Sequence, residues 1–131
     1  MNYQNDVYLD THVLVWLSQT STHHLSKTVI EFLEDGHNRL LISPMVVLEL
    51  EFLHEIGRIN HSADEILAMI SDVLELTICQ KSWINVVKMA TTLKFTRDPF
   101  DRLITAHAKL DNNLLITKDT KITTHYAHCI W

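Results

Sequence analysis

Short apolar runs alternate along the chain with longer stretches in which apolar residues recur every three to four positions. Short runs bounded by turn-forming residues predict strands, here over residues 7–9, 40–42, 76–79, 113–117 and 128–131. The longer spacing predicts helices over residues 11–18, 26–36, 44–56, 62–74, 82–93 and 98–110. Because strands and helices alternate, we expect an α/β domain with a central, mostly parallel sheet and helices on both faces.

Length and composition favour a single domain over residues 1–131. Of the 131 residues 47% are hydrophobic, and only two are Gly and two Pro, which indicates one core without long linkers. Charged residues break every apolar run well short of the roughly 18 residues of a membrane span, and the start of the chain does not resemble a signal peptide. We therefore expect a cytoplasmic protein with no membrane segment. Cys79 and Cys129 lack zinc-site spacing, so we expect two reduced thiols.

The charge balance limits how the chain could bind nucleic acid. A formal net charge of −5 argues against binding over the whole surface, because a basic face normally supplies affinity for phosphate. Any contact must be local, and the last third of the chain offers Arg97, Arg102, Lys118 and Lys121. The alternative is a solvated surface of mixed charge.

Four acidic residues stand where an apolar run ends or would otherwise continue. Asp10 and Asp119 follow predicted strands, Glu49 lies within a largely apolar helix, and Asp101 precedes an apolar pair. A carboxylate in such a position needs a partner that compensates its charge. Four of them converging on one cleft would repel one another unless a cation held them. The set therefore indicates a divalent metal site.

The expected fold brings three of these acids to one edge of the sheet. Ligands of parallel α/β sheets bind outside the carboxyl ends of the strands, where Asp10 and Asp119 belong. Asp101 lies in the first turn of a helix that can start near the same edge.

Glu49 shares its predicted helix with two other acids, Glu51 and Glu55. Its neighbours on one helix face form an apolar stripe of Met45, Val46, Leu53 and Ile56. We therefore expect Glu49 to face inward, and Glu51 and Glu55 to face solvent.

Each acid also has a purely structural alternative. Asp10 and Asp119 could cap the helices that follow them, and the segment from Asp98 to Asp101 resembles a capping box with Pro99 at the first helical position. Glu49 could form a buried ion pair with an Arg or Lys. Capping cannot explain an acid in the middle of a helix, so the four acids together favour the metal site.

At this point the order and spacing of several stretches match a known family. The stretches are Tyr8-Leu9-Asp10-Thr11-His12 with Trp16-Leu17, Ile42-Ser43 with Glu49 and Gly57-Arg58-Ile59, Arg97-Asp98-Pro99-Phe100-Asp101-Arg102-Leu103-Ile104, and Leu115-Ile116-Thr117-Lys118-Asp119. Together they resemble the PIN domain, specifically the VapC-type toxins of bacterial toxin–antitoxin pairs. The resemblance spans residues 7–122.

The resemblance implies a fold, an activity and partners. It implies a compact PIN-like α/β domain with a parallel sheet, and an endoribonuclease that uses Mg²⁺ or Mn²⁺ to cleave RNA. It also implies a homodimer, inhibition by a VapB-like antitoxin, and contact with operator DNA only through that antitoxin.

The resemblance also assigns roles to residues. Carried over to this chain, the catalytic and metal-binding set is Asp10, Glu49, Asp101 and Asp119. Asp98 matches the same motif, and we interpret it as a helix cap or a residue that supports the ligands. Thr11, Ser43 and Thr117 stand where their hydroxyls could hydrogen-bond the carboxylates or a metal-bound water.

Three other interpretations remain open at this stage. A catalytically silent PIN-like binding domain would not need the complete acid set. A haloacid-dehalogenase-type phosphatase needs a second Asp two residues after the first, where this chain has His12. A receiver-like signalling module needs a phospho-acceptor Asp at the end of a central strand, which the stretch around Cys79 does not supply. We interpret Trp16 and Trp131 as core or interface residues rather than base-stacking platforms.

Overall fold

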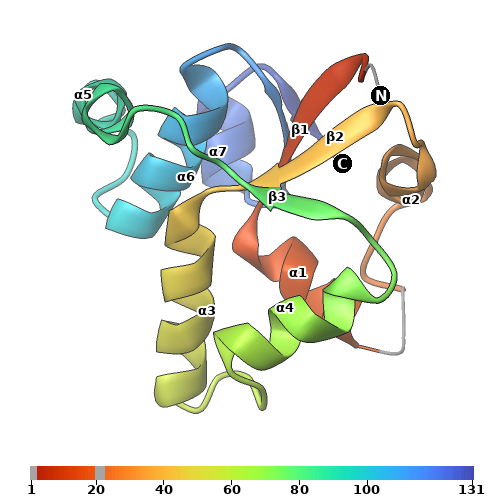
Figure 1. Cartoon of the computed structure of the whole chain (residues 1–131). Coiled ribbons are helices and arrows are strands. Elements are labelled where there is room, and N and C mark those ends of the chain that lie inside the picture. The colour runs from red at the N-terminus through yellow and green to blue at the C-terminus, as the bar shows by residue number, and fades with distance from the viewer. Residues whose placement is uncertain (1–2, 20–22) are drawn as a thin grey trace.

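The described part of the chain forms one sheet of five strands, all of them parallel (Figure 1). The structure is a computed structural model and describes residues 3–19 and 23–131. Across the sheet the strands follow the order β3-β2-β1-β4-β5. Their bounds are Asn5–Leu9 (β1), Asn38–Ile42 (β2), Leu76–Ile78 (β3), Leu114–Ile116 (β4) and Cys129–Ile130 (β5). The expected parallel sheet and all five expected strands are confirmed.

Helices surround this sheet. Their bounds are Thr11–Ser18 (α1), Lys27–Glu34 (α2), Pro44–Glu55 (α3), Ala63–Ser71 (α4), Trp83–Thr91 (α5), Pro99–Lys109 (α6) and Thr120–His125 (α7). In Figure 1, α1, α3 and α4 pack together below the strands, whereas α5, α6 and α7 gather at the upper left. No helix within the described ranges has the length and apolar character needed to cross a membrane.

The limits of α3 follow from residues at its two ends. The Ser43 hydroxyl accepts a hydrogen bond from the Met45 backbone N–H at 3.1 Å, and Pro44 occupies the first turn, where no N–H partner is needed. Gly57 ends the helix with a φ of 76°, a conformation that favours glycine. These ends fix the position of Glu49 in the middle of α3.

The core lies on both faces of the central strands, as a parallel sheet requires. Its fully buried side chains include Leu9, Leu14, Ile42, Leu50, Ile104, Leu115 and Ile116. The three central strands are therefore apolar on both faces, and polar residues are tolerated only where these strands end.

Our prediction of which α3 side chains are buried and which face solvent is partly wrong. Val46 and Leu50 are fully buried, but Ile56 is 51% exposed, so the apolar stripe does not extend to the end of the helix. Glu51 does not simply face solvent, because its Oε1 accepts a hydrogen bond from the Ala63 backbone N–H at 3.1 Å. The physical reason is that α4 begins beside α3 and needs an acceptor there, whereas the last turn of α3 extends beyond the core.

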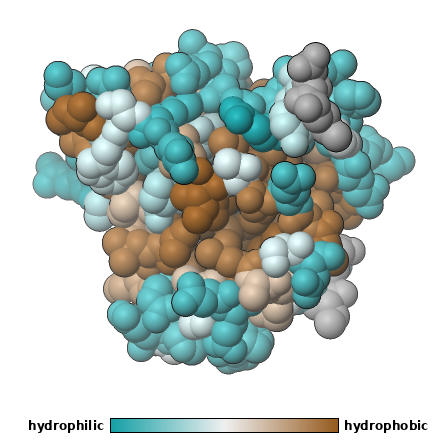
Figure 2. Space-filling model, in the orientation of Figure 1, coloured by the Kyte–Doolittle hydropathy of each residue, from teal (hydrophilic) through white to brown (hydrophobic). Residues whose placement is uncertain are grey.

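An apolar band crosses one face of the molecule. Figure 2 shows it over α3 and between β3 and α4, with a separate hydrophobic area over α5. Large exposed apolar side chains here are Leu48 and Phe52 on α3, Ile56 directly after α3, Ile78 on β3, and Trp83 and Ile84 on α5. Apolar surface of this extent often marks a contact with another protein.

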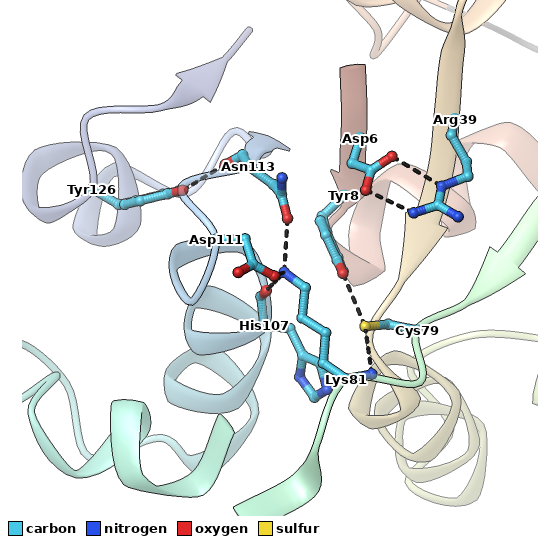
Figure 3. Close-up of polar contacts among 9 residues, drawn as sticks. All are labelled: Asp6, Tyr8, Arg39, Cys79, Lys81, His107, Asp111, Asn113 and Tyr126. Carbon is cyan, nitrogen blue, oxygen red and sulfur yellow. Dashed lines mark hydrogen bonds and ion pairs between the residues drawn. The ribbon is translucent and has the colours of Figure 1, made fainter. Parts of the chain in front are cut away.

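A polar network anchors the C-terminal end of α6 (Figure 3). The Lys81 ammonium donates to the His107 carbonyl and to Asn113 Oδ1, both at 2.7 Å, and forms an ion pair with Asp111 at 3.1 Å. It also lies 4.9 Å from the ring centroid of Tyr8 on β1. The network therefore fixes α6 against the sheet, with Asp101 at the other end of the same helix.

Replacing Lys81 should destabilise the fold. Lys81→Met leaves the acceptors at His107 and Asn113 without their donor, so we expect a loss of about 1–3 kcal/mol in the free energy of unfolding. Urea unfolding measures this loss, with Lys88→Met on α5 as the control, because Lys88 is exposed. Equal stability of the two variants would contradict the anchoring role.

Candidate functional site

Asp10 lies at the carboxyl end of β1 and is only 7% exposed. One carboxylate oxygen accepts the backbone N–H of Thr11 at 2.7 Å, and the other accepts the Thr117 hydroxyl at 2.6 Å. Burial raises the pKa of Asp10, whereas these two hydrogen bonds and the nearby His12 lower it, and burial has the larger effect. Asp10 therefore caps α1, as its structural alternative predicted, and also belongs to the polar edge of the sheet.

Glu49 reaches the same edge from α3. The Thr11 hydroxyl donates to Glu49 Oε1 at 2.5 Å, so Thr11 binds Asp10 through its backbone N–H and Glu49 through its side chain. Burial raises the pKa of Glu49, the Thr11 hydrogen bond lowers it, and the charges of Asp10 and Asp98 raise it further. Within the described ranges no Lys or Arg forms an ion pair with Glu49. Its structural alternative, a buried ion pair, is therefore wrong for this part of the chain.

Asp119 follows β4 and is joined to Asp10 through a threonine. The Asp119 backbone N–H donates to the Thr117 hydroxyl at 3.1 Å, and that hydroxyl in turn donates to Asp10. Asp119 Oδ1 accepts the backbone N–H groups of Lys121 and Ile122 at 2.8 and 3.1 Å. Asp119 therefore caps α7 with one oxygen.

Two acids at the start of α6 have different roles: Asp98 caps the helix, whereas the Asp101 carboxylate is not used as a cap. Asp98 Oδ1 accepts the backbone N–H groups of Phe100 at 2.8 Å and Asp101 at 3.3 Å, which confirms our interpretation of Asp98 as a cap. The backbone N–H of Asp98 donates to the Thr96 hydroxyl at 3.2 Å, so Asp101 does not complete a capping box. The Asp101 side chain has no hydrogen-bond donor among the described residues.

The charges of these acids act on one another most strongly at Asp101. Burial raises the pKa of Asp101 to about 7, together with the negative charges of Asp98, Asp119, Asp10 and Glu49. The fold thus brings all four predicted acids within electrostatic range of one another. Over residues 3–19 and 23–131, however, no three His, Cys, Asp or Glu side chains already surround a point where a metal ion would bind.

The chemistry of the donor set fits a hard divalent cation. Every donor is a carboxylate oxygen, the type of ligand that Mg²⁺ and Mn²⁺ prefer. A cation at this edge would offset the negative charges that, together with burial, raise the pKa of Asp101 to about 7. Such an ion can also lower the pKa of a bound water and stabilise charge on a phosphate undergoing attack.

Two of the three expected hydroxyls contact the acids. Thr11 and Thr117 donate to Glu49 and Asp10, as expected. Ser43 does not, because its hydroxyl caps α3 and lies 2.9 Å from Nδ1 of the buried His107. The position of Ser43 directly before Pro44 is a capping signal in the sequence, and that role engages the hydroxyl.

Sequence reasoning gave His12 no role in the site. Its positive form lowers the pKa of both Asp10 and Glu49, and its ring contacts Trp16 with 5.9 Å between centroids. The sequence carries one signal for this proximity, because His12 lies two residues after Asp10 at the start of a helix.

Comparison with known proteins shows similarity over nearly the whole chain. The PIN domain family model matches residues 7–127. A chain of VapBC2 from Rickettsia felis, bound to a promoter DNA fragment, superposes with a TM-score of 0.66 at 19% identity, covering 95% of this chain and 96% of that one. A chain of DNA-bound VapBC from Salmonella typhimurium gives a TM-score of 0.62 at 16% identity, with 96% of each chain covered. A toxin–antitoxin complex from Klebsiella pneumoniae gives 0.65 at 19% identity, over 95% of this chain and 96% of that one. The sequence matches none of the curated proteins.

Removing the charge of Asp101 should stabilise the metal-free protein. The folded state raises the Asp101 pKa from 3.8 to about 7, so the ionised side chain opposes folding above about pH 7. This cost decreases as the pH falls through 7 and is almost absent at about pH 4. In EDTA near pH 8, Asp101→Asn should therefore gain roughly 1 kcal/mol after solvent screening, or a few degrees in the midpoint of thermal unfolding.

The control is Asp72→Asn, at an exposed residue that follows α4. The midpoint of thermal unfolding of Asp72→Asn should stay near that of the wild type both near pH 8 and at about pH 4. Added Mn²⁺ should raise the wild-type midpoint more than that of Asp101→Asn. A lower midpoint for Asp101→Asn than for the wild type near pH 8 in EDTA would contradict the electrostatic account.

Proposed function

Since the chain belongs to the PIN domain family, whose members are generally nucleases, we propose that it is an endoribonuclease that uses Mg²⁺ or Mn²⁺ to cleave RNA. PIN nucleases generally use divalent metal ions. The observation that carries the proposal is the set of uncompensated carboxylates around Asp101, where burial and the charges of the other acids together raise the pKa of Asp101 to about 7. A divalent cation would compensate that charge and supply hydrolytic chemistry at the same place.

Each acid has a proposed role. Asp10, Asp101 and Asp119 would hold the metal, and Glu49 would bind a second ion or orient the attacking water. Thr11 and Thr117 would fix the orientation of Glu49 and Asp10 through the hydrogen bonds that they already donate. When bound, the metal would activate a water for attack on the phosphodiester and offset charge on the phosphorus centre.

Because the chain belongs to the PIN family, the alternative function that remains is that of a catalytically silent PIN-like domain. All four acids are present, and Glu49 is held by a hydrogen bond from Thr11 rather than neutralised by a cation. A domain without catalytic function has no need for acids that destabilise one another. This arrangement favours a working nuclease.

The proposed biological role is that of a toxin controlled by a VapB-like antitoxin. The solved structures with this fold include VapBC complexes, two of them bound to DNA. By analogy, an antitoxin would inhibit this chain by binding beside the acids, and operator DNA would be bound through the antitoxin. The proposed RNA substrate fits a location in the cytoplasm.

Of the four basic residues that we expected to contact RNA, Arg102 has another role. The Arg102 guanidinium donates two hydrogen bonds to the Ala90 carbonyl, at 3.2 and 2.9 Å, so it serves mainly to join α6 to α5. Arg97, Lys118 and Lys121 are exposed and remain the candidates for contact with phosphate.

We also propose that the chain forms a homodimer through the apolar surface of α3. Leu48 and Phe52 are 55% and 43% exposed, and Figure 2 shows an apolar band over this helix. A two-fold dimer would bury the same surface of each copy and remove these side chains from water.

Loss of either of two central carboxylates should abolish cleavage. With a labelled RNA and Mg²⁺, Asp10→Asn and Asp101→Asn should each reduce the rate by at least about a hundredfold, because each removes a metal ligand. EDTA should stop the wild-type reaction. Retained cleavage by either variant, with the fold shown intact by circular dichroism, would refute the assigned roles.

Charges placed on α3 should separate the dimer. We expect Leu48→Asp and Phe52→Asp to sediment as monomers while the wild type sediments as a dimer, because each substitution would bury an unpaired carboxylate. The control is Tyr3→Asp, at an exposed residue that precedes β1 and is not part of α3. A monomeric wild type, or variants that remain dimeric, would exclude α3 as the dimer surface.

A further inference from the structure

The side chain of Lys118 lies on two tryptophan rings beside the acids. Its ammonium nitrogen is 5.9 Å from the ring centroid of Trp16 and 5.7 Å from that of Trp131. Although Lys118 directly precedes Asp119, no ion pair joins it to a carboxylate in the described part of the chain. In this part of the chain its positive charge is therefore held over two rings and is not neutralised by an acid.

The elements that carry the acids also position both rings. Strand β5 pairs with β4 so that Ile130 lies beside Ile116, and the Thr117 backbone N–H donates to the Ile130 carbonyl at 3.3 Å. Trp131 therefore emerges at the edge where Thr117 binds Asp10. Trp16 belongs to α1, the helix that Asp10 caps.

The two rings also support each other. Their centroids are 5.6 Å apart with an edge-on angle of 64°, and Trp16 stacks on His24 with 5.4 Å between centroids and an angle of 15°. Trp16 and Trp131 both pack against the hydrophobic core. The interpretation of these residues as core aromatics is thus correct for their inner surfaces, but they also face a cation.

The contact has an energetic consequence for an exposed lysine. A free Lys side chain loses conformational entropy when it is ordered on a ligand. A cation over an aromatic ring is attracted to the ring face, and Lys118 contacts two rings. Much of the ordering has therefore taken place before a ligand arrives.

We propose that Lys118, held in place by Trp16 and Trp131, binds an RNA phosphate adjacent to the one that is cleaved. This inference rests on the proposed ribonuclease function. The net charge of −5 and the cluster of acids both repel RNA, so a cation at the rim of the site is needed to admit the strand. Lys118 is the binding residue, and the two tryptophans are positioning residues that act through it.

A comparison of two lysines tests the role of Lys118. Lys118→Ala and Lys27→Ala each remove one positive charge from an exposed residue, and Lys27 lies on α2, which carries none of the acids. For a labelled single-stranded RNA in Mg²⁺, Lys118→Ala should raise KM about five- to tenfold with kcat little changed, and Lys27→Ala should raise it less than twofold. Lys118→Arg should restore most of the affinity. Equal KM values for the two Ala variants would overturn the proposal.

The role of the rings requires a double substitution. Trp131→Leu should raise KM in the wild type but add little in the Lys118→Ala background, because it acts by releasing Lys118. Trp131→Phe keeps an aromatic face and should preserve most of the affinity. Equal effects of Trp131→Leu in both backgrounds would show a role independent of Lys118 and overturn the positioning claim. Thermal unfolding of each variant monitors loss of the fold.

Binding in EDTA separates this inference from the proposed function. There the slope of log affinity against log salt concentration should be shallower by about 0.7 for Lys118→Ala than for Lys27→Ala. If the wild type cleaves RNA and the slopes are equal, the role of Lys118 is wrong while the nuclease function stands. If the wild type does not cleave RNA, the nuclease function is wrong, and the same slopes still decide whether Lys118 binds phosphate.

Discussion

Where β1 and β4 end, carboxylates from four different parts of the chain lie close enough for their negative charges to act on one another. Asp101 shows the effect most clearly, because burial and four neighbouring acids raise its pKa to about 7. Carboxylate oxygens of Asp10 and Glu49 accept hydrogen bonds from Thr11 and Thr117. In the described ranges, however, no lysine or arginine forms an ion pair with either acid. Such a cluster opposes folding unless a cation joins it. The metal requirement of the proposed nuclease follows from this repulsion.

The remainder of the fold keeps the repelling groups in place. Apolar strands that are buried on both faces form a rigid sheet, and Asp10 and Asp119 lie directly at its edge. The helix α6 carries Asp101 at one end and is anchored at the other by Lys81, which bonds the His107 carbonyl. Stability is therefore concentrated in the apolar core and in the anchor of α6, and the opposite end of the helix can carry an unfavourable charge.

Periodicity and strand–helix alternation were enough to predict the parallel sheet, its five strands and the four acids at its edge. Capping signals were also informative, because Asp10 and Asp119 do cap helices while they belong to the site. Side-chain contacts between distant segments could not be predicted. Helix periodicity does not reveal that α4 begins beside Glu51, and nothing local indicates that Lys81 reaches the end of α6. The placement of Lys118 over Trp16 and Trp131 likewise depends on β5 pairing with β4.

The most direct test of the account is a titration of the purified protein with Mn²⁺, in which electron paramagnetic resonance measures the free ion. The account predicts that the wild type binds one or two ions per chain near neutral pH, that binding weakens as the pH falls well below the Asp101 pKa of about 7, and that Asp10→Asn and Asp101→Asn bind Mn²⁺ far more weakly. If all of the added Mn²⁺ remained free in the wild-type titration, or if the wild type and both variants bound it equally, the claim that these carboxylates form a metal site would be contradicted.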